Sequence, residues 1–167
     1  PWLYINDKED AHKLQAIEQW GDIHWETMEG SFRGAENMVM NATDVPDLSG
    51  VTNMSHMFRE ARSFNGDLSG WDVSKVANMS FMFRQASEFN GDLSDWDVSE
   101  VTNISQMFAA ASVFNSDLSA WDVSGVKYMQ RMFLGARSFD GDLSGWDVSN
   151  VRDMNWMFGG AIAFNSD

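Results

Sequence analysis

Apolar residues recur along the chain with a period of 25 residues from Val51 onward. The first unit is VTNMSHMFREARSFNGDLSGWDVSK at 51–75, and the following units align with it without gaps. Self-similarity at a fixed period indicates a repeat architecture in which each unit packs mainly against its neighbours. We therefore expect an N-terminal cap at 1–24, a degenerate first repeat at 25–50, and four full repeats plus one truncated repeat at 51–167.

The spacing of apolar residues changes within each unit. The first half places them at i, i+3, i+4 and i+7, which predicts one face of a short helix. In the first unit these residues are Met54, Met57, Phe58 and Ala61. The turn pair Asn65-Gly66 follows, and the residues at 67–74 alternate in the manner of a strand. Each predicted coil is therefore helix, turn and strand, and the predicted fold class is an α/β repeat solenoid.

The segment before the repeats has an apolar spacing of its own. Ala11, Leu14 and Ile17 precede Trp20-Gly21, which predicts an amphipathic helix that ends at the glycine. This N-terminal helical cap would cover the open face of the first coil.

Composition follows from the same repeat. The 167 residues include 12 Met, 12 Phe and 8 Trp but no Cys, and most of these large side chains occupy identical positions in successive units. Each buried large side chain contributes roughly 1.5–3 kcal/mol. The columns are thus interpreted as a stacked core that needs no disulfide bonds.

The repeated frame MF-x-x-A-x-x-F-N-x-D-L-S-x-W-D-V-S-x-V-x-x-M resembles that of a known family. It is similar to the bacterial surface-protein repeats, the BspA-like relatives of leucine-rich repeats. The resemblance implies a leucine-rich-repeat-like solenoid with a non-enzymatic, surface-exposed role in adhesion or recognition. It also implies an extracellular or cell-surface location in a bacterium, and a protein, peptide or glycan partner on another cell or the host.

Charge excludes several classes of function. The chain has 25 acidic and 11 basic residues, a formal charge of −14, and lacks the clustered cations that nucleic-acid binding requires. Its apolar stretches are too short for membrane insertion. The 3 histidines have no metal-ligand spacing and cysteine is absent, so we expect no enzyme and no cofactor. Both ends look like cuts, which suggests a monomeric fragment of a longer chain.

Two aspartate columns carry much of the negative charge. The first contains Asp67, Asp92, Asp117, Asp142 and Asp167, and the second contains Asp72, Asp97, Asp122 and Asp147. Like charges on neighbouring coils repel, so one interpretation ties the first column to backbone N–H groups and turns the second into solvent. The alternative is calcium that bridges the coils through carboxylate oxygens.

A third polar column has a structural interpretation. Asn65, Asn90 and Asn115 repeat, and Asp140 replaces the asparagine once. The asparagine ladder of leucine-rich repeats suggests that these side chains satisfy backbone groups between coils.

The predicted ligand-binding residues lie on the second aspartate column and beside it. They are Asp72, Asp97, Asp122, Asp147, Ser74, Ser99, Ser124, Ser149 and Trp156. Trp156 belongs to a variable column with His56, Phe81, Gln106 and Arg131, in which Phe81 and Trp156 are predicted to be exposed. A following coil that covers Trp156 is the alternative for that residue, and a structural spacer, possibly stabilised by calcium, is the alternative for the whole chain.

Overall fold

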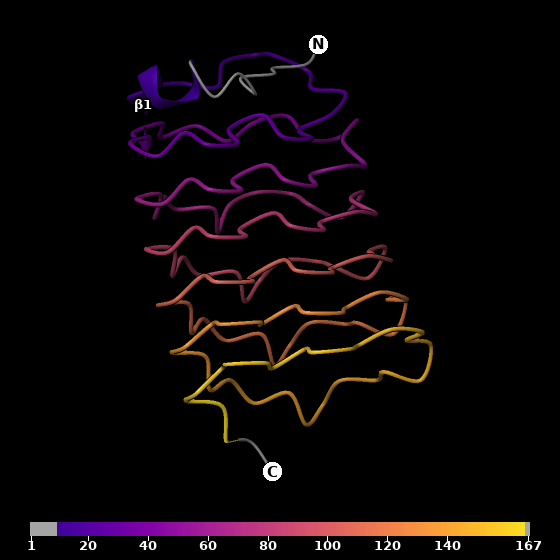
Figure 1. Cartoon of the computed structure of the whole chain (residues 1–167). Coiled ribbons are helices and arrows are strands. Elements are labelled where there is room, and N and C mark those ends of the chain that lie inside the picture. The colour runs from indigo at the N-terminus through magenta and orange to yellow at the C-terminus, as the bar shows by residue number, and fades with distance from the viewer. Residues whose placement is uncertain (1–9, 166–167) are drawn as a thin grey trace.

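The computed structural model describes residues 10–165, which wind as a stack of coils from the N-terminal to the C-terminal end (Figure 1). Regular elements in this part of the chain are few: a 3₁₀ helix, η1, at Ala11–Lys13 and two short strands, β1 at Ala16–Ile17 and β2 at Val39–Met40. The strands are parallel, with Ala16 opposite Val39 and Ile17 opposite Met40. The repeats themselves are built from turns.

Consecutive β-turns replace the predicted helix. Within 51–75 the backbone N–H of Met57 donates to Met54, that of Arg59 to His56, and that of Ala61 to Phe58, at 3.1–3.2 Å. An α-helix would need bonds between residues four apart. Turns also span 68–71 and 73–76, where the strand was expected. The predicted α/β leucine-rich-repeat-like solenoid of helix-turn-strand coils is therefore wrong.

Hydrogen bonds between coils explain why no helix forms. The N–H groups of Met54, His56, Phe58 and Glu60 donate to carbonyl oxygens 24 residues later, at 2.8–3.0 Å. The same four positions donate to the next coil throughout 79–135. Because an α-helix would use these groups internally, the stacking of coils and the helix exclude each other.

Left-handed backbone accompanies these bonds. His56 and Glu60 have φ of 60° and 65°, and the equivalent residues of each later coil are also positive. The second position is occupied by Gly34, Glu60, Gln85, Ala110, Gly135 and Gly160. A non-glycine residue at positive φ carries steric strain of about 1 kcal/mol. The coil geometry therefore overrides local preference.

The N-terminal segment also differs from its prediction. Leu14 follows η1 in an extended conformation and β1 then pairs with β2, so residues 11–17 form no amphipathic helix. Trp20 is nevertheless buried, and its ring meets that of Trp71 edge-on at 5.4 Å. Residues 1–9 of the predicted cap lie outside the described residues.

Large apolar side chains fill the centre of the stack. Phe58 lies parallel to Phe83 of the next coil with ring centroids 5.5 Å apart, and to Phe64 of its own coil at 4.2 Å. The Phe columns continue in this arrangement to Phe164. The interpretation that the Met, Phe and Trp surplus forms the core is confirmed.

The asparagine column forms a ladder between coils. The Oδ1 atom of Asn65 accepts the backbone N–H of Asn90 at 2.8 Å, and Asn90 accepts that of Asn115 at 2.7 Å. Asp140 joins the same ladder, because its carboxylate accepts from Asn165 as an amide oxygen would. The predicted role between coils is confirmed, although these side chains are exposed.

Substitution of Asn90 tests this ladder. Asn90→Ala removes the acceptor of the Asn115 N–H and is expected to lower the free energy of unfolding in urea by about 1 kcal/mol. Asn90→Asp is the control, since Asp140 shows that a carboxylate can accept the same bond. Equal losses in both variants would contradict the proposed role of the acceptor.

The left-handed column gives a second prediction. Ala110→Gly relieves strain at φ 58° and should raise the melting temperature, whereas Gly135→Ala introduces strain at φ 71° and should lower it. Each change corresponds to about 1 kcal/mol in the free energy of unfolding. The nearest heavy atom to a Cβ at Gly135 is 3.8 Å away, so strain rather than a clash decides the result. Calorimetric shifts of the opposite sign would overturn this explanation.

Candidate functional site

Both aspartate columns lie on exposed turns. Asp67 Oδ1 accepts the backbone N–H of Ser69 at 3.0 Å, and Asp72 Oδ1 accepts that of Ser74 at 3.1 Å. The same bond occurs in each coil through Asp147 and Ser149. The first column is thus tied to the backbone from Asp67 to Asp142, as expected, and its last member, Asp167, lies outside the described residues. The second is both exposed and tied to the backbone, which the sequence interpretation missed.

These hydrogen bonds keep the carboxylates ionised. The N–H and then the hydroxyl of the following serine lower the pKa of the first-column residues, which are Asp67, Asp92, Asp117 and Asp142. In the second column the serine hydroxyl and then its N–H lower the pKa of Asp72, Asp97 and Asp122. Each aspartate accepts these bonds through Oδ1, and within the described residues its Oδ2 has no hydrogen-bond donor.

Neither column forms a ready metal site. Among residues 10–165 no group of three or more His, Asp or Glu side chains is placed to hold a metal ion. Calcium bridging therefore has no preformed ligand cluster in this region. In the same region no helix is long and apolar enough to cross a membrane.

Trp156 lies apart from the aspartates, on the column of left-handed residues that begins at Gly30. This residue is 70% exposed, as predicted. Phe81 was also predicted to be exposed but is half-buried, because its ring stacks on that of His56 at 4.5 Å and Arg84 lies over it at 5.9 Å. The structure therefore brings the aspartates and serines together and leaves Trp156 outside their columns.

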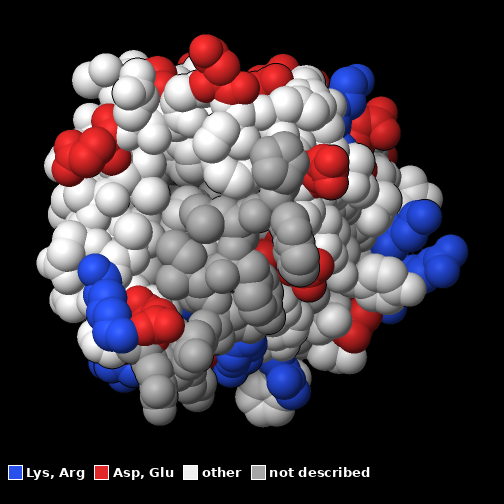
Figure 2. Space-filling view, turned by 90° about the horizontal axis from the view of Figure 1, so that it is seen from above, with Lys and Arg blue, Asp and Glu red and all other residues white. Residues whose placement is uncertain are grey.

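Arginines accompany the His56–Phe81 stack. Burial, followed by the charges of Arg59, Arg33 and Arg84, lowers the pKa of His56 to about 4. Arg59 Nη1 lies 3.4 Å from His56 Nδ1, a contact that needs a neutral imidazole as acceptor. Seen from above, acidic side chains line the top edge of the view, and basic side chains lie beside acidic ones at its left and right (Figure 2). The sequence interpretation missed this basic column.

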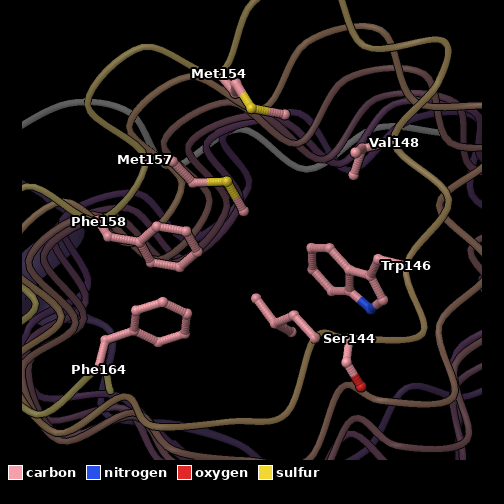
Figure 3. Close-up of a pocket in the computed structure, with 8 residues that line it drawn as sticks. Ser144, Trp146, Val148, Met154, Met157, Phe158 and Phe164 are labelled. Carbon is pink, nitrogen blue, oxygen red and sulfur yellow. The ribbon is translucent and has the colours of Figure 1, made fainter. Parts of the chain in front are cut away.

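An apolar hollow of about 240 Å³ lies at the last coil, between the side chains of Trp146, Met157, Phe158 and Phe164 (Figure 3). The corresponding residues of the preceding coil are fully buried, among them Phe133 and Phe139. This hollow is therefore the end face of the described core, and its shape alone gives no ligand.

His56 predicts a pH dependence. Its folded pKa of about 4 lies below the ordinary value of 6.5, so the unfolded chain binds more protons between these values and stability should fall as pH drops from 6.5 to 4. His56→Gln introduces the residue that Gln106 provides at the same position of a later coil, and it should flatten this part of the curve. Arg33→Gln should raise the His56 pKa in an NMR titration, and a wild-type midpoint near 6.5 would contradict the burial effect.

Comparison with known sequences identifies one family, described as Mycoplasma protein of unknown function, DUF285. It matches residues 5–103, 26–132 and 91–167, and these overlapping matches agree with the repeated unit. No curated protein and no solved structure matches the chain. Because the first match alone covers more than half of its length, the chain belongs to this repeat family of unknown function.

Proposed function

We propose that the chain is a non-enzymatic binding module that recognises a basic protein or peptide through its acidic turns. The observation that carries the proposal is the pair of exposed aspartate columns. Within the described residues, each Oδ1 of these columns accepts the N–H of a serine and no Oδ2 has a donor. Fixed, ionised acceptors at a constant repeat interval suit lysine or arginine side chains, and a partner with such side chains is steered by long-range attraction.

Two further properties expected from the sequence, its family kinship and its location, are part of this proposal. The motif frame supports kinship with bacterial surface-protein repeats and a location outside the cell, where a recognition module would meet its partner. The absence of an enzymatic activity and of a cofactor stays a prediction. The matching family is described as one of unknown function, so these features rest on the motif frame.

Substitution by asparagine separates charge from structure. The second-column variant replaces Asp72, Asp97, Asp122 and Asp147 with Asn, which keeps the Oδ1 acceptor for the serine N–H. The matched control replaces Glu18, Glu29, Glu36 and Glu88 with Gln and removes the same number of charges away from the column.

The measurement is binding to an array of cationic peptides, neutral peptides and glycans at low and high salt, with and without calcium. Wild type should bind cationic peptides, more weakly as salt rises. The aspartate variant should lose at least about tenfold in affinity, the effect of 1.4 kcal/mol, and the control should lose far less. Salt-independent binding, or equal losses in both variants, would refute the proposed face.

A further inference from the structure

A second hollow, of about 350 Å³, lies between Trp20 and Trp71 beside the first coil. It arises where the repeat is imperfect. Later coils have Trp-Asp-Val-Ser, but the segment at 46–49 is Pro-Asp-Leu-Ser, so Pro46 stands where the others place an indole. Trp20, from the N-terminal segment, instead packs edge-on against Trp71.

The indole groups of Trp20 and Trp71 lack the carbonyl acceptor that the tryptophans of the later coils have. Nε1–H of Trp96 donates to the Leu68 carbonyl at 3.0 Å, and Trp121 and Trp146 repeat this bond. Within residues 10–165 the indole N–H groups of Trp20 and Trp71 have no acceptor, although the two residues are only 4% and 5% exposed. Nε1 of Trp25 also lacks an acceptor but is buried, whereas the Nε1 atoms of Trp20 and Trp71 are not fully buried. Both tryptophans line the hollow, and neither indole N–H is bonded within the described part of the chain.

Carboxylates supply acceptors on the same wall. Asp67 uses Oδ1 for Ser69 and leaves Oδ2 free, while Asp44 accepts the backbone N–H groups of Trp20 and Gly21. An anionic ligand would satisfy the indoles but would be repelled by both carboxylates. An ammonium or guanidinium group would suit the carboxylates but has no acceptor for the indoles. The hollow therefore favours a neutral group that both donates and accepts.

We propose that the Trp20–Trp71 hollow binds a neutral saccharide residue through its hydroxyl groups. A hydroxyl both donates and accepts and turns freely, so neighbouring hydroxyls can meet an indole N–H and a carboxylate oxygen together. A trans peptide group holds its N–H donor and C=O acceptor at opposite edges of one rigid plane. Met40 and Val45 also line the hollow and offer apolar contact to the C–H groups of a sugar ring. The site is distinct from the acidic face, although Asp67 belongs to both.

Indole NMR resonances test the site directly. The ¹⁵N-labelled chain is titrated with the methyl glycosides of glucose, galactose, mannose and N-acetylglucosamine, and indole signals are assigned from Trp→Phe variants. At least one glycoside should shift the Trp20 and Trp71 signals saturably and leave those of Trp96, Trp121 and Trp146 in place. The shift should persist in high salt because the ligand is uncharged, which separates this result from binding at the acidic face.

A matched pair of variants completes the test. Trp71→Phe should weaken glycoside binding at least about tenfold, through loss of one hydrogen bond in a mostly buried site. Trp96→Phe removes an indole already bonded within the protein and should leave the affinity unchanged. The proposal is overturned if no glycoside shifts the two signals saturably in wild type, or if a blocked dipeptide shifts them and the glycosides do not.

Discussion

The backbone hydrogen bonds between coils are the constraint on which the rest of the structure depends. In every repeat from Met54 to Gly135, four backbone N–H groups at alternate positions donate to carbonyl oxygens of the next coil. Between these donors, the intervening N–H groups, such as those of Met57 and Arg59, bond within the coil and close tight turns. The left-handed residues at His56 and Glu60 allow the chain to alternate between the two kinds of bond.

The same register determines which side chains meet. Because neighbouring coils are offset by a whole repeat, each side chain faces its own copy, so one favourable contact is multiplied along the stack. Phe58 on Phe83 and Asn65 on Asn90 are two such contacts, one apolar and one polar. The same register also repeats the repulsion between like charges in every coil. Hydrogen bonds from serine N–H groups offset this repulsion at Asp67 and Asp72.

The sequence alone predicts the period, the core columns and the exchange of asparagine for Asp140, because these depend only on which residues repeat. It could not distinguish a helix from consecutive turns, since both place residues at i, i+3, i+4 and i+7 on one side. The sequence also did not predict the positive φ of these positions, because His56 and Phe81 occupy them instead of glycine. The hollow at Trp71 depends on how Trp20 docks, and no periodic pattern contains that information.

Which groups are free to bind a ligand depends on whether a coil follows the regular repeat. A regular coil uses its own donors: the indole of Trp96 is occupied by Leu68, and the N–H of Asn90 by Asn65. What a regular coil leaves free is carboxylate oxygen, repeated at a constant interval, which suits an extended basic partner. The irregular first coil leaves the indole donors of Trp20 and Trp71 free beside the carboxylates of Asp44 and Asp67, which suits a small neutral ligand. The two surfaces therefore differ in chemistry because the repeat is kept in one and interrupted in the other.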